Sequence, residues 1–367
     1  MATRIIIAGG GTGGHIFPAV AIAHEVRRRE PDAAILFVGA KGGMEMDVVP
    51  KQGYDIKGVW ISGLQRQLNL RNILRNVLFP VKLIVSMFQA MSIHRGFKPN
   101  VVVGVGGYAS GPMGRVAASQ KTPLAICEQN AFPGLVNRWL KKYARRILLG
   151  NDAASKYFPT DKSIVTGNPI RAFVPKEKTE GAAAFNLDPN KPILLSLGGS
   201  LGALSINNAL QKTVQQALDA DVQVIWQTGK RYIDRLEASV PAHPNLRMSA
   251  FIDDMAAAYG AADLVISRAG GSTISELIAL EKPAILVPSP NVSEDHQTKN
   301  ARSLADVGAA AMVHDSDAET KLISEALALL NDKTKLQTIQ TNLTNIEKHN
   351  AAKEIVDEIM RLASLAT

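Results

Sequence analysis

The fold is decided by residues Ile5–His15, which read IIIAGGGTGGH. A β-branched run that ends in glycines and leads into a helix-like segment, here Pro18–Arg28, is typical of the first strand, turn and helix of a Rossmann-like domain. The pattern returns at Leu194–Ser200, LLSLGGS, before a second helix-like segment over Ser205–Ala220. Two such starts, about 190 residues apart, predict two Rossmann-like domains and not one large sheet.

Further short apolar runs alternate with helix-like stretches in both halves of the chain. Runs without alternating polarity predict parallel strands that are buried on both faces. The alternation of strand and helix predicts a doubly wound α/β architecture. The runs are Arg4–Ala8, Ala34–Val38, Val101–Val105, Leu124–Cys127, Ile147–Leu149, Ile193–Leu197, Val222–Trp226, Leu264–Ser267 and Ala284–Val287.

Turn residues place the domain boundary near Gly167-Asn168-Pro169, after the last strand-like run of the first half. We therefore expect an N-terminal domain over residues 1–168 and a C-terminal domain over residues 169–349. Residues 350–367 contain an amphipathic helix, which either closes the second domain or packs back on the first.

The chain has 367 residues and a formal net charge of +8, which its two halves share unequally. Residues 1–170 carry 22 Lys and Arg against 9 Asp and Glu, a net charge of +13. Residues 171–367 carry 19 against 24, a net charge of −5. A basic first half predicts an anionic partner, which is nucleic acid, a phosphate-bearing substrate or an anionic membrane surface.

Cysteine use and the apolar segments predict a protein of the reducing cytoplasm. The single Cys127 excludes a disulfide scaffold. The N-terminus turns glycine-rich after a short apolar run, so no secretion signal is expected. The most apolar long stretch, Val77–Ile93, contains Pro80 and Lys82. It is not expected to span a bilayer, which takes about 20 mostly apolar residues.

The first glycine turn contains GxGxxG at Gly9, Gly11 and Gly14, a turn whose N–H groups favour anions at a helix N-terminus. A dinucleotide site also needs an acidic residue at the end of the second strand. The first carboxylate after that strand is Glu45, which counts against an NAD-dependent oxidoreductase. His15, at the start of the following helix, is either a packed first-turn residue or a general base beyond the strand ends.

Three other turns follow predicted strands. Gly104–Pro112 is a second anion-binding turn or a site of close helix packing. Glu128-Gln129-Asn130 supplies substrate contacts or forms a loop capped by Asn130, and Gly198–Ala203 is a phosphate cradle or a tight turn.

Two short acidic patterns have competing interpretations. Thr273-x-x-Glu276 matches a capping box, in which Glu276 caps its own helix. The alternative is a carboxylate that binds a ribose diol. Asp315-Ser316-Asp317 resembles a metal-binding DxD, but Asp and Ser are also preferred helix caps, which we favour here.

Seven motifs in this order resemble the MurG family of N-acetylglucosaminyltransferases, in glycosyltransferase family 28. The resemblance extends from Ile5 to at least Ala301. It implies the GT-B fold, two Rossmann-like doubly wound parallel-sheet domains that face each other across a cleft. The motifs are GGTGGH from Gly10, GGYxSGP from Gly106, EQN from Glu128, GNPxR from Gly167, GGSxGA from Gly198, SRAG from Ser267 and DHQTxNA from Asp295.

The resemblance also implies the reaction and its location. GlcNAc would pass from UDP-GlcNAc, with inversion, to the 4-hydroxyl of MurNAc in undecaprenyl-diphosphate-MurNAc-pentapeptide, converting lipid I to lipid II in peptidoglycan synthesis. The enzyme would be peripheral on the cytoplasmic face of the bacterial inner membrane and would work beside other cell-wall synthesis proteins. No tightly bound cofactor or metal and no nucleic acid is expected.

Site residues follow from motif positions. His15 is the first candidate for the general base and Glu128 the second. Leu201 and Cys127 depart from the Gln and His that the family often has at these positions. Acceptor contacts are expected from Gly13, Gly14, His15, Gly106, Gly107 and Tyr108. UDP-GlcNAc contacts are expected from Thr12, Gly13, Gly14, Asn130, Arg171, Ser200, Phe251, Ile252, Glu276 and Gln297.

A basic and apolar segment within the first half predicts a membrane contact, because the polyprenyl tail of the acceptor stays in the bilayer. Arg71, Arg75 and Lys82 interleave with apolar residues that include Leu78 and Phe79. Basic residues around apolar ones are typical of an interfacial segment.

Rival hypotheses are an NAD-type oxidoreductase, a nucleic-acid-binding protein and a non-hydrolysing UDP-GlcNAc epimerase with the same fold. The pI of about 9.5 suggests nucleic acid, but the aromatic content is only 5% and no base-stacking or zinc motif is present.

Overall fold

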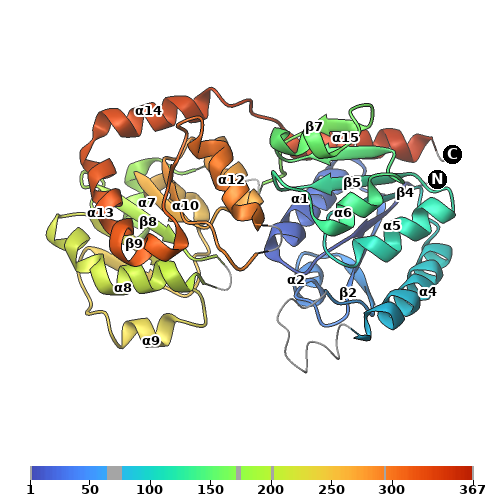
Figure 1. Ribbon diagram of the computed structural model, residues 1–367, viewed down its shortest axis with the longest axis horizontal. Coiled ribbons are helices and arrows are strands. Elements are labelled where there is room, and N and C mark those ends of the chain that lie inside the picture. Colours follow the sequence, from blue (N-terminus) through green and yellow to red (C-terminus); the bar gives the residue numbers. More distant parts are fainter. Residues whose placement is uncertain (1, 64–76, 171–174, 200–201, 293–294, 366–367) are drawn as a thin grey trace. The chain divides into compact units, whose positions relative to one another are not determined.

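The computed structural model describes residues 2–63, 77–170, 175–199, 202–292 and 295–365. The chain forms two compact units (Figure 1). Unit 1 comprises Met1–Arg171 together with His349–Thr367, and unit 2 comprises Ala172–Lys348. The C-terminal helix therefore belongs to the first unit, although unit 2 separates the two segments in sequence.

Unit 1 contains a seven-stranded parallel sheet in the order β3-β2-β1-β4-β5-β6-β7. The order reverses direction between β1 and β4, which is the position where doubly wound folds bind ligands at the carboxyl ends of their strands. The strands are β1 Arg4–Ala8, β2 Ala34–Ala40, β3 Asp55–Val59, β4 Val101–Gly104, β5 Leu124–Glu128, β6 Arg146–Leu149 and β7 Ser163–Val165.

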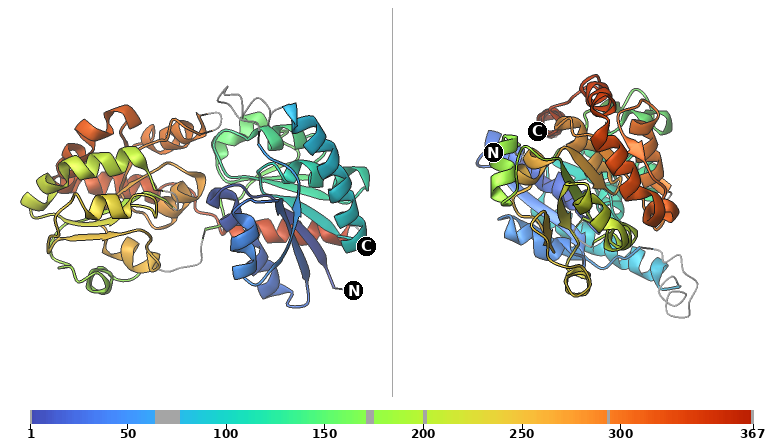
Figure 2. Two further views of the ribbon diagram at one scale, coloured as in Figure 1. Left: turned by 90° about the horizontal axis from the view of Figure 1, so that it is seen from below. Right: turned by 90° about the vertical axis from the view of Figure 1, so that its left-hand side faces the viewer.

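Helices cover both faces of this sheet because successive strand residues point to opposite sides. Ile5 and Ile7 pack with α1 and α15, whereas Ile6 and Ala8 pack with α4 and α5. Figure 2 shows these helices on the two sides of the sheet. The helices of unit 1 are α1 Gly13–Arg29, α2 Glu45–Lys51, α4 Phe79–Phe97, α5 Ser110–Ser119, α6 Leu135–Leu140, the 3₁₀ turn η1 Asp152–Tyr157, and α15 Ala351–Ser364.

Ion pairs fasten α15 to unit 1 beside its apolar contacts. Arg29 of α1 donates to Asp357 at 2.5 Å, and Arg146 at the start of β6 donates to Glu358 at 2.9 Å. The buried face of α15, which includes Ile355 and Ile359, joins the same core cluster as α1. The apolar side of the amphipathic C-terminal helix thus packs against one face of the first sheet.

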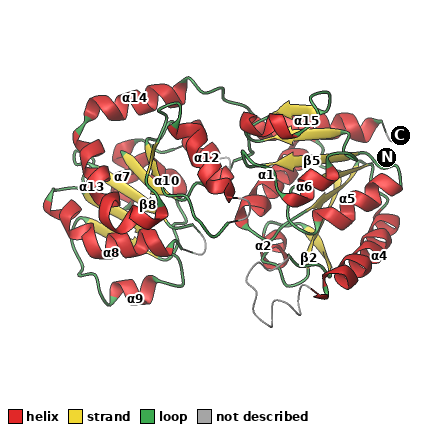
Figure 3. Ribbon diagram, viewed as in Figure 1, coloured by secondary structure: helices red, strands yellow, loops and turns green. Residues whose placement is uncertain are grey.

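Unit 2 repeats the plan with a six-stranded parallel sheet in the order β10-β9-β8-β11-β12-β13. Figure 3 shows strands of this unit in yellow with helices in red around them. The strands are β8 Ile193–Leu197, β9 Gln223–Gln227, β10 Leu246–Ser249, β11 Leu264–Ser267, β12 Ala284–Leu286 and β13 Ala311–Met312. The helices are α7 Lys178–Ala184, α8 Leu204–Asp219, α9 Ile233–Glu237, α10 Met255–Ala261, α11 Gly271–Ala279, α12 His296–Ala305, η3 Asp315–Asp317, α13 Ala318–Asn331 and α14 Lys333–Thr344.

The doubly wound α/β prediction is confirmed, and its apolar runs correspond to the central strands of both sheets. The predicted apolar runs do not include β3, β7, β10 and β13, which are the edge strands of the two sheets. Edge strands lack a neighbour on one side, and the residues of these four are mostly half-buried or exposed. A search for continuous apolar runs therefore finds the interior of each sheet and not its edges.

Within the described ranges, no helix combines the length and the apolar character needed to cross a bilayer.

Candidate functional site

The two glycine turns of unit 1 form one structure at the carboxyl ends of β1 and β4. Gly10 N–H donates to the Gly106 carbonyl at 3.3 Å, and Val105 N–H donates to the Ala8 carbonyl at 2.9 Å. The contact is so close that a Cβ atom on Gly107 would lie 2.3 Å from the Gly10 carbonyl oxygen. The two turns lie about 95 residues apart in the sequence. They can pack this closely only because both have glycines at the contact, which have no side chains to clash.

His15 is the third residue of α1, and its ring lies against the two hydrogen-bonded glycine turns. Its Nδ1 lies 3.0 Å from the Gly10 carbonyl oxygen. A carbonyl oxygen only accepts hydrogen bonds, so Nδ1 carries the proton and Nε2 is the basic nitrogen of the neutral ring. A Cβ on Gly106 would lie 2.8 Å from Nε2, so the glycine makes room for that nitrogen. Nε2 is therefore the ring nitrogen that can accept a proton when the imidazole is neutral.

The other predicted residues of these turns lie around His15. Thr12 and Gly14 are exposed, and Gly13 is half-buried at the first position of α1. Tyr108 is half-buried and packs over Gly63, where a Cβ would lie 2.5 Å from its ring.

Glu128 ends β5 and organises the loop that follows it. Its carboxylate accepts hydrogen bonds from the Asn130 and Gly134 N–H groups and from the Asn137 side chain, at 3.1, 3.0 and 2.9 Å. The Asn130 amide also donates to it at 3.3 Å, so Asn130 is held by Glu128. Burial raises the pKa of Glu128, and these hydrogen bonds oppose that rise. With 2% of its surface exposed, Glu128 fixes the shape of the loop.

Cys127, one of the departures from the family pattern, is buried on β5 beside Glu128. Burial raises the pKa of its thiol to about 12, with a smaller contribution from the negative charge of Glu128. The thiol therefore stays protonated at neutral pH and serves as a packing residue.

The glycine turn of unit 2 connects β8 to α8. Gly198 N–H donates to the Gln227 carbonyl and Gly202 N–H to the Gly199 carbonyl, both at 3.1 Å. A Cβ on Gly202, whose φ is +77°, would lie 2.4 Å from the Thr228 carbonyl oxygen. Ser200 and Leu201 of this turn, and Arg171, lie outside the described residues.

Glu276 does not cap its own helix, so the capping-box interpretation is wrong. Helix α11 begins at Gly271 with Gly270 as its N-cap, three residues before the cap that the pattern predicted. Glu276 is therefore the sixth helical residue, beyond the first turn. Its Oε2 accepts a hydrogen bond from the Tyr259 hydroxyl of α10 at 2.9 Å. That bond orients a half-buried carboxylate one and a half turns into the helix.

The remaining predicted donor contacts lie in other loops of unit 2. Phe251, 48% exposed, and the buried Ile252 follow β10. Gln297 is the second residue of α12, and its Oε1 accepts from the Ser289 N–H at 2.8 Å.

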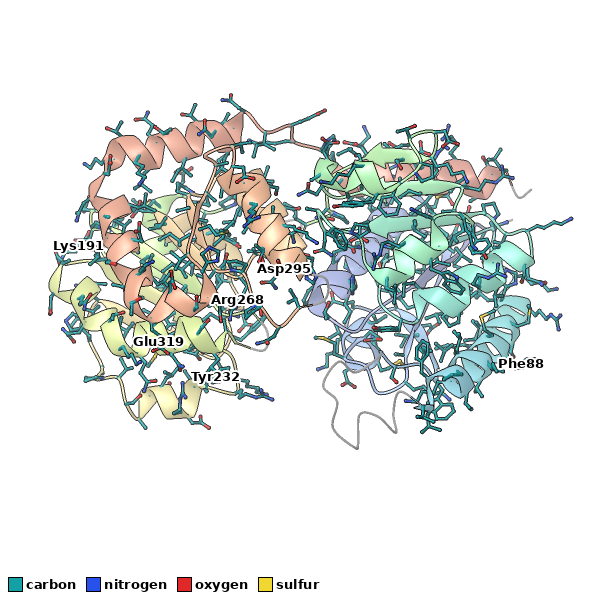
Figure 4. The ribbon with its side chains drawn as sticks, in the orientation of Figure 1. Phe88, Lys191, Tyr232, Arg268, Asp295 and Glu319 are labelled. Carbon is teal, nitrogen blue, oxygen red and sulfur yellow. The ribbon has the colours of Figure 1, made fainter. Side chains whose placement is uncertain are left out.

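Arg268 is held by hydrogen bonds to three other segments of unit 2, one of which contains Asp315. The Arg268 guanidinium donates to Asp315 at 2.5 Å, to the Val287 carbonyl at 3.1 Å and to the Ser205 hydroxyl at 3.0 Å. Ser205 in turn donates to Asp315. Figure 4 labels Arg268 among the side chains of unit 2.

The capping interpretation of this acidic pattern needs correction. Asp317 is the N-cap of α13 by position, but its side chain does not accept a capping N–H and instead pairs with Lys321. Across the part of the chain that the structure describes, no three His, Cys, Asp or Glu side chains lie together as a metal site would need. The carboxylate of Asp315 serves instead to hold Arg268.

Comparisons with known proteins identify the family of the chain. Residues 5–149 match the glycosyltransferase family 28 N-terminal domain, and residues 193–359 match the family 28 C-terminal domain. The chain belongs to glycosyltransferase family 28. It is 48% identical to a protein of Bacteroides thetaiotaomicron, over 98% of both chains, named UDP-N-acetylglucosamine–N-acetylmuramyl-(pentapeptide) pyrophosphoryl-undecaprenol N-acetylglucosamine transferase. A protein of Flavobacterium psychrophilum with the same name is 45% identical over 98% of this chain and 97% of its own.

Solved structures support the family assignment. The crystal structure of Acinetobacter baumannii MurG matches 98% of this chain and 99% of its own, with a TM-score of 0.77 and 29% identity. The calicheamicin glycosyltransferase CalG4 has a TM-score of 0.70 over the full length of both chains at 15% identity, which shows a shared fold alone. The GT-B prediction is thereby confirmed for this family 28 chain.

The predicted membrane segment of this family 28 chain is described in part. Arg71 and Arg75 lie outside the described residues. Lys82 lies on α4, where its Nζ donates to the Ser62 hydroxyl at 2.8 Å and lies 5.7 Å from the centre of the Trp60 ring. Leu78 is exposed just before α4, whereas Phe79 packs against the core.

The sequence pattern missed an apolar stripe on the outer side of α4. Val77, just before α4, and Val81, Ile84 and Phe88 of α4 recur at intervals of four, three and four residues, the spacing of one helix face. All four are exposed, Phe88 to 73% (Figure 4). This spacing is visible in the sequence, but only the packing of the opposite side of α4 on the sheet shows that the stripe faces outward.

Proposed function

We propose that this chain transfers GlcNAc from UDP-GlcNAc to the lipid-linked MurNAc-pentapeptide, converting lipid I to lipid II in peptidoglycan synthesis. The observation that carries the proposal is the identity of 45–48%, over nearly the whole chain, to relatives named as this transferase. In this reaction the 4-hydroxyl of MurNAc attacks C1 of GlcNAc with inversion, and UDP leaves.

His15 is the general base in this proposal. A base must take the proton of the attacking hydroxyl, a role that contributes typically about 10²–10⁴-fold to the rate. The hydrogen bond from Nδ1 to the Gly10 carbonyl leaves Nε2 as the basic nitrogen, and this nitrogen lies beside Gly106, where the missing side chain leaves space. Glu128 is the weaker candidate, because its buried carboxylate already accepts four hydrogen bonds, three from the loop that follows it and one from Asn137 of α6.

Unit 2 binds the donor nucleotide in this proposal. Glu276, oriented by Tyr259, accepts hydrogen bonds from the ribose diol, and Phe251 and Ile252 lie beside the uracil. The glycine turn with Ser200, together with Arg171, receives the diphosphate, whose charge grows as UDP leaves. Asn130 and Gln297 contact the donor sugar, as do Thr12, Gly13 and Gly14.

No tightly bound metal is needed in this proposal. The acidic pattern that most resembles a metal site places its Asp315 carboxylate against Arg268 and Ser205. N–H groups of the glycine turn and cationic side chains supply the positive charge for the leaving diphosphate.

Unit 1 brings the enzyme to the acceptor in the membrane. Val77, Val81, Ile84 and Phe88 enter the interface, and the net charge of +13 on residues 1–170 attracts anionic lipid. Gly106, Gly107 and Tyr108 contact the acceptor near His15. The location that follows is peripheral, on the cytoplasmic face of the inner membrane.

The direct test incubates the protein with UDP-[¹⁴C]GlcNAc and a short-chain lipid I analogue. The expected result is label in the lipid product and release of UDP in equal amount. Conversion of UDP-GlcNAc to its C2 epimer with no label in lipid would overturn the proposal and assign an epimerase. No reaction with either substrate would also overturn it.

A further inference from the structure

Glu45 is a buried carboxylate that lies between the end of β2 and the first glycine turn. It is the first residue of α2, and only 1% of its surface is exposed. Its Oε2 accepts the Gly11 N–H and its Oε1 accepts the Ala40 N–H, both at 2.9 Å. A buried carboxylate is costly unless it is hydrogen-bonded, so these two contacts fix its position.

Glycines around Glu45 leave the space that its carboxylate occupies. A Cβ on Gly10 would lie 2.2 Å from the Glu45 carboxyl carbon, and a Cβ on Gly43 would lie 2.4 Å from Oε2. Two separate turns therefore lack side chains where this carboxylate lies. The first turn is rich in glycine in part because the Glu45 carboxylate occupies the space that a side chain would need.

The anion occupies a position that dinucleotide-binding folds give to their ligand. In GxGxxG the second glycine lets the backbone approach a pyrophosphate. Gly11 is that glycine here, and its N–H donates to Glu45. A phosphate at this amide would be repelled by the negative charge of the Glu45 carboxylate. The Gly11 N–H therefore binds a side chain of the protein and not a phosphate.

A single peptide group links Glu45 to His15. The Gly11 N–H that donates to Glu45 and the Gly10 carbonyl that accepts from His15 Nδ1 belong to the same peptide unit. That unit is planar and rigid, so fixing its N–H also fixes its carbonyl. Hydrogen bonds in such a chain also polarise one another, which makes the carbonyl a stronger acceptor for the imidazole proton.

We propose that Glu45 is a positioning residue for the transfer reaction, acting on His15 through the peptide group between Gly10 and Gly11. The arrangement does what a carboxylate bonded directly to a catalytic histidine does: it selects the tautomer and stabilises the imidazolium that forms. The proposal rests on the proposed function, in which His15 is the base.

The test compares four proteins: the parent, Glu45→Gln, His15→Ala and the double variant. Gln has the same shape but offers one acceptor oxygen to two N–H donors and carries no charge. We expect Glu45→Gln to lower kcat by about 10–100-fold, since small misplacements of a catalytic group cost rates of this order. In the His15→Ala background the same substitution should change kcat by less than about twofold, because its effect passes through His15.

Two controls separate this effect from loss of structure. UDP binding, which depends on unit 2, should stay within about twofold of the parent value. Glu354→Gln removes a carboxylate that accepts the Asn350 N–H at the start of α15, and it should leave kcat unchanged. If Glu45→Gln does not fold, Glu45→Ala is assayed with and without formate, which should restore activity where chloride does not.

Equal fold-losses in the two backgrounds, or a kcat of Glu45→Gln within about twofold of the parent, would overturn the proposal. So would a His15→Ala enzyme as active as the parent. The activity of the parent on lipid I tests the proposed function separately, because it does not depend on either variant.

Discussion

In unit 1 the glycine turn after β1 donates its Gly11 N–H to the Glu45 carboxylate, whereas in unit 2 the turn after β8 donates its Gly202 N–H to the Gly199 carbonyl. Both turns follow a buried apolar strand, contain paired glycines and lead into a helix. The first turn thus donates to a carboxylate of a neighbouring segment, whereas Gly198 and Gly202 of the second turn donate to backbone carbonyls, those of Gln227 and Gly199. Similar local sequences can therefore position a histidine in one unit and, as we propose, receive a diphosphate in the other.

Net charge differs in the same way between the two halves of the chain. The first 170 residues carry +13 and the rest −5. A positive unit suits an anionic membrane and a diphosphate-bearing acceptor. Variants that change one unit alone test the proposed functions of the two units.

The largest effect is expected for His15→Ala in unit 1. Loss of the base should lower kcat by about 10²–10⁴-fold and leave UDP affinity unchanged, because the nucleotide binds unit 2. Single-turnover rates and UDP binding measure the two quantities. The matched control is His24→Ala on the same helix, whose ring packs against Tyr54 at 5.5 Å and which should keep the parent kcat. An unchanged single-turnover rate for His15→Ala would remove His15 from the mechanism.

The next effect is expected for Glu276→Ala in unit 2. A hydrogen bond to a charged group contributes about 1.5–3 kcal/mol, so the parent should prefer UDP-GlcNAc over its 2′-deoxyribose analogue by about 10–100-fold. The variant should bind both donors alike, and Tyr259→Phe should give an intermediate preference because the carboxylate loses its orienting bond. Competition between the two donors measures this preference. A variant that discriminates as the parent does would exclude Glu276 from the ribose site.

A smaller effect is expected when a negative charge is introduced on the proposed membrane face of unit 1, which comprises Lys82 and the exposed apolar stripe. Phe88→Glu, which changes the charge by one, should weaken binding to anionic vesicles by about fivefold or more, and Lys82→Glu, which changes it by two, by about 30-fold, since each charge near such a surface contributes about 1 kcal/mol. Sedimentation with the vesicles measures this binding. Turnover of a soluble short-chain acceptor should be preserved. The control is Val307→Glu, which changes an exposed apolar residue of unit 2 and should sediment like the parent. Equal binding of all the variants would place the membrane face elsewhere.

The smallest effect concerns acid stability of unit 1. A hydrogen bond from Arg28, with another from Arg29, lowers the pKa of Glu25 from 4.5 to about 2. The ionised carboxylate therefore stabilises the folded state above the unfolded pKa, and this contribution disappears as the pH falls from about 4.5 to 2. Glu25→Gln should lower Tm by about 1–3 °C at pH 7, and the difference should narrow below about pH 4.5. A difference that does not change with pH would show that the loss is not electrostatic.

Local patterns were enough to predict the central strands and the presence of a helix after each glycine turn, although α1 begins at Gly13 and not at Pro18. β1, β8 and β11 occur at the predicted residues, because a strand buried on both faces must be apolar throughout. The edge strands and the true start of α11 were not predicted, because exposure and the capping residue depend on what lies beside each segment. Thr273-x-x-Glu276 fits a capping box by spacing, yet the chain enters that helix at Gly271.

The sequence by itself determined the fold class, the repeated strand–glycine–helix plan and the family, because these depend on residue order and on the burial that each residue type prefers. Only the tertiary structure decided which atoms meet. It placed Glu45 and His15 on opposite sides of one peptide group, and it set Asp315 against Arg268, 47 residues away. Hydrogen bonds need partners within about 3 Å. For residues far apart in the chain, that distance is set by how the strands are ordered in the sheet, which no local pattern contains.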